Sequence, residues 1–227
     1  LVEGFKFTLP DSKISVRLPI GTEKTIKAMG KDRFVDFYEK YYTPSRLAVV
    51  AVGDFDVAQI EDLIRSHFDR LESRPTAPDP DLGQVTTGRG VIAKVHYEEE
   101  MPYTRIGLEI ARPWTPRKDE ASTRFDDLQW GLADRILSRR FQILAKEEGS
   151  PILQVSVSHG DFLQHVEGPE MQITCKPERW AEALALGEQE LRRAIEHGFT
   201  QAELDEAKAK VLNAYEQAQK GAPTRKS

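Results

Sequence analysis

The sequence has little cysteine, no long hydrophobic run and no excess of basic residues, and each absence excludes a class of protein. The single cysteine, Cys175, excludes an internal disulfide, and no cysteine and histidine cluster has zinc-finger spacing. No apolar run approaches the roughly 18 residues of a transmembrane helix, so no membrane span is predicted. The net charge of −5 gives no basic surface for nucleic acid, and no such partner is expected.

The chain also lacks a recognisable leader. It begins at Leu1 rather than methionine, and no basic segment is followed by an apolar one, so we expect that the natural amino terminus has been removed. With 227 residues, 39% hydrophobic and 30% charged, the chain can form an ordered core. That length predicts one large domain or two smaller ones.

Residues 32 to 71 have the pattern of a helix, a buried strand and a second helix. The run from Arg46 to Val52 is continuously β-prone and ends at Gly53-Asp54, which is typical of a strand buried on both faces. Pro44 ends the helix before it, and Asp56 caps the helix after it. The first helix has an aromatic stripe that predicts a core face: Phe34, Phe37, Tyr38, Tyr41 and Tyr42.

A second pattern follows a segment with three prolines and three glycines between Ser73 and Gly90, which we interpret as an interdomain linker. Gly198 is expected to end one of its helices, and Thr200 with Glu203 forms a capping box for the next. The predicted elements are strands at 91–97, 103–110, 152–159 and 170–175, and helices at 119–147, 177–197 and from 200 onward.

Within the strand at 152–159, apolar Leu153, Val155 and Val157 alternate with polar residues, so one face is expected to be buried. A turn is expected at Gly160-Asp161 and the neighbouring residues. Strands and long helices together predict the α+β class, with mixed sheets covered by helices.

Three motifs in order resemble the insulinase/pitrilysin family of zinc metallopeptidases, peptidase family M16: Arg17-Leu-Pro-Ile-Gly-Thr, Phe37-Tyr-Glu-Lys-Tyr-Tyr-Thr-Pro44 and Leu47-Ala-Val-Val-Ala-Val-Gly-Asp54. The resemblance continues through Ile136-Leu-Ser-Arg-Arg-Phe141 and is weakest at 1–15 and 75–102. It implies that residues 1–73 are the C-terminal half of the metal-bearing domain. Residues 74–90 would be the linker, and 91–227 a truncated second domain of the same fold without a metal.

In that family, zinc is held by the two histidines of a His-x-x-Glu-His helix and a downstream glutamate, and the glutamate of the motif is the general base. The histidines of this chain, at 67, 96, 159, 165 and 197, lack that spacing. No catalytic residue and no metal ligand is therefore predicted here, and the substrate-binding residues are unknown. Zinc is expected only in the longer parent protein, and this chain alone is expected to be inactive.

The resemblance implies a parent that cleaves peptides or unfolded polypeptides in an enclosed chamber. The alternative is a metal-free relative that binds peptides or acts as a scaffold. A third reading, an unrelated α+β module, would place the 46–52 strand at an exposed sheet edge. Expected partners are a peptide substrate, the missing parts of the same chain and possible further copies of it. A bacterial periplasm or cytoplasm is the compartment that the resemblance suggests.

Two local clusters contain metal-ligand side chains, and both have a simpler interpretation. His96 precedes Glu98, Glu99 and Glu100, but side chains alternate along a strand, so only His96 and Glu98 share a face. A solvated acidic strand end is expected there. His159, Asp161 and His165 surround the expected turn, where such residues are common.

The remaining candidates are polar or reactive side chains. Ser156 and Ser158 are expected on the polar face of their strand rather than on a peptide-binding edge. Arg139 and Arg140 are expected to pair at the surface or with the helix dipole rather than with a substrate carboxylate. Cys175 shares a face with apolar residues and is expected to be buried and inert.

Overall fold

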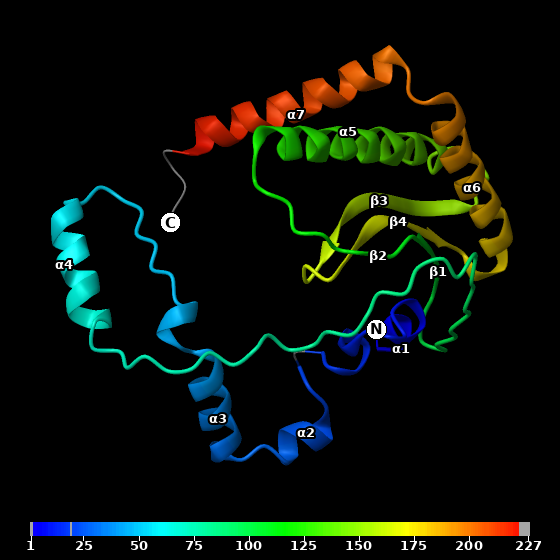
Figure 1. Ribbon diagram of the computed structural model, residues 1–227. Coiled ribbons are helices and arrows are strands. Elements are labelled where there is room, and N and C mark those ends of the chain that lie inside the picture. The colour runs from blue at the N-terminus through cyan, green and yellow to red at the C-terminus, as the bar shows by residue number, and fades with distance from the viewer. Residues whose placement is uncertain (1, 19, 223–227) are drawn as a thin grey trace. The chain divides into compact units, whose positions relative to one another are not determined.

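The structure is a computed structural model that describes residues 2–18 and 20–222, so Leu1, Pro19 of the Leu-Pro-Ile-Gly motif and residues 223–227 lie outside the described residues. The chain forms two compact units (Figure 1). One, here called the sheet unit, comprises residues 1–12 and 83–227. The other, here called the helical unit, comprises residues 13–82. The division into peptidase domains at 1–73, 74–90 and 91–227 stays a prediction.

The sheet unit is built on one antiparallel sheet. Its central strand is β4 (Val166–Cys175), which pairs with β3 (Ile152–Phe162) on one side. On the other side β4 pairs with β1 (Thr104–Glu109) and with the short β2 (Arg112–Pro113). The predicted α+β class is confirmed, although the described strands are all antiparallel rather than mixed.

One face of this sheet is apolar, and two helices cover it. Met171, Ile173 and Cys175 of β4 are buried against Phe141 of α5 (Ala121–Leu144) and Ala183 of α6 (Trp180–His197). Figure 1 shows α5 lying along the sheet and α7 (Gln201–Gly221) lying on α5. The core of the unit is therefore the layer between β3, β4 and these two helices.

The caps between the last two helices form as predicted. Gly198 ends α6 with a φ of 69°, a left-handed value that favours glycine. Thr200 and Glu203 form the capping box of α7, in which each side chain accepts the backbone N–H of the other residue. The unit also contains α1 (Val2–Thr8) and η3 (Pro177–Arg179), and Phe5 of α1 stacks on Phe162.

Two details of the β3–β4 hairpin differ from the prediction. A bulge lies between Ile152 and Gln154, so Leu153 leaves the ladder and is exposed while Ile152 takes its place in the core. The turn lies among the predicted neighbours, at Leu163 and Gln164, whose φ values are 55° and 51°, and not at Gly160-Asp161 themselves. Gly160 instead pairs with Gly168 inside the hairpin.

The helical unit has no strand among its described residues. Its elements are η1 (Lys13–Val16), α2 (Glu23–Lys27), α3 (Lys31–Tyr41), η2 (Pro44–Arg46) and α4 (Val57–Phe68). The predicted helices are present, and Asp56 caps α4 by accepting the backbone N–H of Gln59.

The strand predicted at 46–52 is wrong for this structure. Residues 47–52 are not in a strand, and the side chains of Val50 and Val52 are 81% and 92% exposed. The predicted strand at 91–97 is also absent. A strand needs a neighbouring backbone to pair with, and neither segment is paired into a sheet within 2–18 and 20–222. The aromatic stripe of α3 was expected in the core, but Phe34 and Phe37 are exposed for the same lack of a covering layer.

Candidate functional site

The acidic cluster after residue 95 lies on an exposed, irregular segment. His96 Nε2 lies 2.7 Å from Glu98 Oε1, and both side chains are more than half exposed. Glu99 and Glu100 are exposed in a turn. The cluster is solvated as expected, but it does not end a strand.

The second predicted cluster does not come together. His159 stacks on Trp130 with the ring centroids 4.8 Å apart, Asp161 accepts the backbone N–H of Gln164, and His165 Nε2 lies 2.9 Å from Ser12 Oγ. Each of the three residues has a separate structural contact.

The described residues do not fit a zinc site. Within 2–18 and 20–222, no group of three or more histidine, cysteine, aspartate or glutamate side chains is arranged to hold a metal ion. No reaction step can therefore be assigned to a metal held by these residues.

No helix within residues 2–18 and 20–222 is long and apolar enough to cross a bilayer.

The single candidates on the sheet lie where the sequence predicts. Ser156 and Ser158 are exposed on β3, and Cys175 is fully buried beneath α5 and α6. Burial raises the pKa of the Cys175 thiol, with a smaller contribution from the nearby charge of Glu178. A buried thiol with a raised pKa is a poor nucleophile.

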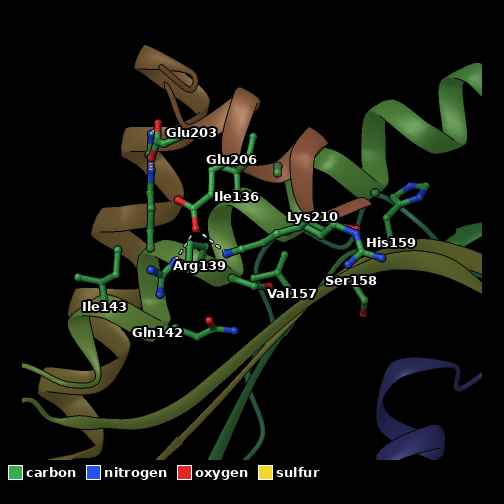
Figure 2. Close-up of a pocket in the computed structure, with 16 residues that line it drawn as sticks. Ile136, Arg139, Gln142, Ile143, Val157, Ser158, His159, Glu203, Glu206 and Lys210 are labelled. Carbon is green, nitrogen blue, oxygen red and sulfur yellow. Dashed lines mark hydrogen bonds and ion pairs between the residues drawn. The ribbon is translucent and has the colours of Figure 1, made fainter. Parts of the chain in front are cut away.

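A pocket of about 520 Å³ lies between α5, β3 and α7 (Figure 2). Ile136, Val157 and Ala207 supply its apolar lining, and charged side chains from both helices surround them. Its size falls within the range of about 300–1,000 Å³ found for small-molecule sites.

One carboxylate in this pocket faces two cations. Figure 2 shows Glu206 of α7 between Arg139 and Lys210, with Arg139 Nε at 3.1 Å and Lys210 Nζ at 2.5 Å from Glu206 Oε1. Hydrogen bonds from Lys210 and then Arg139 lower the pKa of Glu206. Arg135, one turn before Arg139 on α5, also lines the pocket and forms no ion pair within the described residues 2–18 and 20–222.

A further part of the lining is less charged. Asp134 is half-buried beside His159, and burial raises the pKa of its carboxyl group while the charge and backbone N–H of His159 oppose that shift. The Trp130 ring lies parallel to His159. This part of the lining therefore presents the His159 imidazole, which is stacked on Trp130, and a half-buried carboxyl group with a raised pKa.

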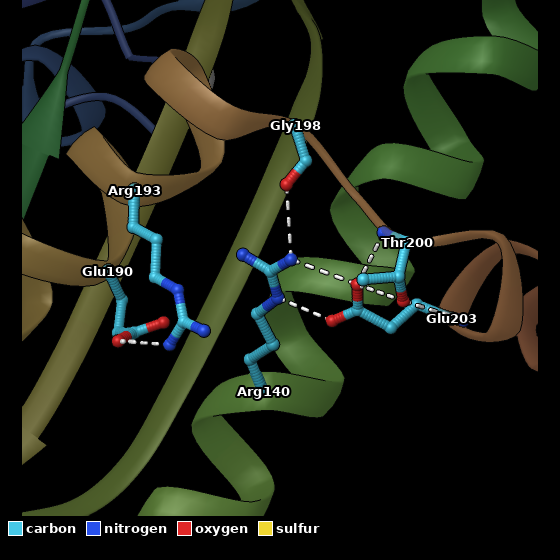
Figure 3. Close-up of polar contacts among 6 residues, drawn as sticks. All are labelled: Arg140, Glu190, Arg193, Gly198, Thr200 and Glu203. Atoms are coloured by element: carbon cyan, nitrogen blue, oxygen red, sulfur yellow. Dashed lines mark hydrogen bonds and ion pairs between the residues drawn. The ribbon is translucent and has the colours of Figure 1, made fainter.

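Arg140 lines the pocket next to the α6–α7 connection (Figure 3). Its Nε and Nη2 atoms donate to the two carboxylate oxygens of Glu203, and Nη2 also donates to the Gly198 carbonyl oxygen. Its Nη1 atom is buried and has no hydrogen-bond partner in the described part of the chain. Glu190, nearby on α6, is buried and pairs with Arg193 at 3.5 Å.

The sequence predicted that Arg139 and Arg140 pair, but it did not identify their partners. Glu203 was visible only as a capping residue, and Glu206 and Lys210 lie about 70 residues from Arg139 in the chain. Their i, i+4 spacing on α7 is a local signal for one helix face. No local pattern shows that this face packs on α5.

Most of the chain matches the model of a known protein family. Residues 28–211 match the model described as the peptidase M16 inactive domain, so the chain belongs to the M16 peptidase family. The match crosses the predicted linker at 74–90 and includes every residue that lines the pocket, from Gly131 to Lys210.

Two curated relatives of the chain are named as zinc proteases. The chain is 26% identical over 194 residues to an uncharacterized zinc protease of Streptomyces coelicolor, which covers 83% of this chain and 41% of that protein. It is 28% identical over 197 residues to an uncharacterized zinc protease of Mycobacterium tuberculosis, with coverage of 85% and 43%. The chain thus spans less than half the length of these relatives.

The fold is shared with a solved protease. The periplasmic protease PqqL from Escherichia coli matches 97% of this chain with a TM-score of 0.80 at 18% identity, and 24% of that chain is covered. At this identity the likeness shows the fold alone. The match of residues 28–211 to the family model confirms the predicted family, although the 46–52 strand is not formed.

Proposed function

We propose that this chain is a supporting, non-metal part of an M16 zinc metallopeptidase that cleaves peptides or unfolded polypeptides. The observation that carries the proposal is the match of residues 28–211 to the family's inactive domain. Relatives named zinc proteases support a proteolytic parent that holds zinc. The zinc ligands and the general base belong to other parts of the parent, because the described residues do not fit a zinc site.

In this proposal the rest of the parent also covers apolar surface that is exposed here. Residues 47–52 have the composition of a buried strand, and the aromatic face of α3 has the spacing of a core helix. Both are exposed in the helical unit. A backbone supplied by another part of the parent would pair with 47–52 and bury these side chains.

The remaining expectations are proposals of the same kind. The substrate is a peptide, further copies of the chain are possible partners, and a bacterial periplasm is the compartment that the fold of PqqL from Escherichia coli suggests. The exposed apolar residues of α3 would favour self-association if they stayed uncovered.

The test is to determine the coding sequence upstream of Leu1. A His-x-x-Glu-His segment there, followed by a glutamate on a second helix, supports a catalytic parent. An upstream region without that segment overturns the proteolytic proposal. It favours the metal-free relative that binds peptides or scaffolds a partner.

A further inference from the structure

We propose that the pocket between α5, β3 and α7 binds a small organic anion that carries a carboxylate or phosphate group. The proposal rests on residues of this chain alone, and it does not depend on whether the parent cleaves peptides. The charges that line the pocket, their pairing and the apolar lining support this assignment.

The lining is cationic although the chain is acidic. Four basic side chains and three acidic ones surround the pocket, whereas the whole chain has a net charge of −5. Arg140 and Glu203 neutralise each other in a two-point pair, so they leave no charge for a ligand. The other cations, Arg135, Arg139 and Lys210, therefore decide what the pocket attracts.

The pocket lining holds fewer carboxylates than are needed to pair with all three of these cations. Arg139 and Lys210 share Glu206, and Arg135 has no ion-pair partner in the described ranges 2–18 and 20–222. Asp134 is the other acid of the lining, and within residues 2–18 and 20–222 it lies half-buried beside His159 and forms no ion pair with these cations. A ligand carboxylate or phosphate can supply the missing negative charge beside Glu206.

The shape of the pocket limits the ligand to a small molecule. About 520 Å³ is lined by Ile136, Val157 and Ala207 as well as by Ser138 and Gln142, which can hydrogen-bond to a polar body. Arg139 and Lys210 are about half exposed, so the anionic group can enter from solvent. The lining thus fits an anionic group joined to a partly apolar body.

Binding is measured by titrating the full 227-residue chain with citrate and, separately, with inorganic phosphate at constant ionic strength. Isothermal calorimetry and amide chemical shifts report affinity and location. Saturable binding of either probe, with shifts confined to α5, α7 and residues 157–159, supports the proposal. The two probes distinguish a carboxylate ligand from a phosphate ligand. If neither binds saturably, the proposal is overturned.

Three variants separate a built site from general charge. Lys210→Met should weaken binding about fivefold, the size expected for one partly exposed charge pair, and Lys208→Met removes the same charge outside the pocket and should stay within about twofold. Glu206→Gln should tighten binding by about threefold, because it removes the carboxylate that competes for Arg139 and Lys210. Equal weakening by both lysine variants, or no tightening with Glu206→Gln, would overturn the proposal. Unchanged far-UV circular dichroism and melting temperature show that the variants are folded.

Discussion

Glu203 joins α7 to α5 and caps α7 with the same carboxylate. Arg140 Nε lies 2.5 Å from Glu203 Oε1 and Nη2 lies 2.9 Å from Oε2, while the backbone N–H of Thr200 donates to Oε2 at 2.8 Å. The two side chains are 15% and 27% exposed, so the pair is well shielded from solvent. The helix cap and the contact between helices are therefore coupled through one charge.

The first prediction concerns that charge. The hydrogen bond from Arg140 is the largest cause that lowers the pKa of Glu203, from an ordinary 4.5 to about 2. A lowered carboxyl pKa means that the stabilisation is complete above pH 4.5 and is lost as the pH falls toward 2. Glu203→Gln should lower the free energy of unfolding by about 2 kcal/mol at pH 7, and this deficit should shrink between pH 4.5 and 2.

Urea unfolding followed by circular dichroism, repeated across that pH range, checks the prediction. Glu216→Gln removes an exposed charge from the same helix and should change stability by less than about 0.5 kcal/mol. A deficit for Glu203→Gln that stays constant down to pH 2 would show that the charge of Glu203 is not the source of the stabilisation.

How far the sequence predicts this structure depends on whether a signal is local. The helix at 121–144, the capping box at Thr200 and the burial of Cys175 follow from periodicity and cap chemistry, which act within a few residues. The run at 47–52 carries the composition of a buried strand, but composition does not show whether a partner backbone is present. The pocket needs Arg139, Glu206 and Lys210 to meet across two helices, and no short-range pattern specifies that meeting.

The hairpin turn shows a second limit. Glycine and aspartate at 160–161 are the stronger turn signals, yet Leu163 and Gln164 adopt the left-handed conformation. Pairing of all β3 residues from Gln154 to Phe162 with β4 extends the ladder past Gly160. The long-range register therefore overrides the local preference of Gly160-Asp161.

A glycine on α6 is predicted to be required for helix–sheet packing. A Cβ atom added to Gly187 would overlap Cδ1 of Ile173, which is fully buried on β4. Gly187→Ala should destabilise the protein by about 1–2 kcal/mol despite the higher helix propensity of alanine. Gly131→Ala on α5 meets no atom within 4 Å and should be neutral or stabilising.

Thermal unfolding of both variants and of a double variant measures the effect. Ile173→Val removes the overlapping atom, so the combination with Gly187→Ala should cost less than the sum of the two single changes. Strict additivity would contradict the proposed contact.

A second glycine pair tests the hairpin. Gly168 and Gly160 are cross-strand partners, but a Cβ atom on Gly168 would overlap the carbonyl oxygen of Ile110, whereas one on Gly160 meets nothing within 4 Å. Gly168→Ala should cost about 3 kcal/mol or more because backbone must move, and Gly160→Ala should cost less than about 1 kcal/mol. Chemical denaturation gives both values, and similar costs at the two sites would refute the packing of β4 against the β1–β2 connection.

A substitution in the exposed apolar segment 47–52 is predicted to have different effects on stability in this chain and in the longer parent. Val52→Lys should change the stability of this chain by less than about 0.5 kcal/mol, because Val52 is 92% exposed. In the longer parent, where we propose that 47–52 is a buried strand, the same change should cost at least about 3 kcal/mol. Denaturation of both proteins decides this, and a neutral effect in the parent would contradict the proposed covering of this segment.

Zinc content measured together with peptide cleavage tests the central claim most directly. This chain and the longer parent are purified in parallel, zinc is quantified by mass spectrometry, and cleavage of an unfolded peptide is followed with and without a chelator. We expect about one zinc per parent chain with chelator-sensitive cleavage, and neither zinc nor cleavage in the 227-residue chain. Stoichiometric zinc or cleavage in the short chain, or their absence from the parent, would contradict the account.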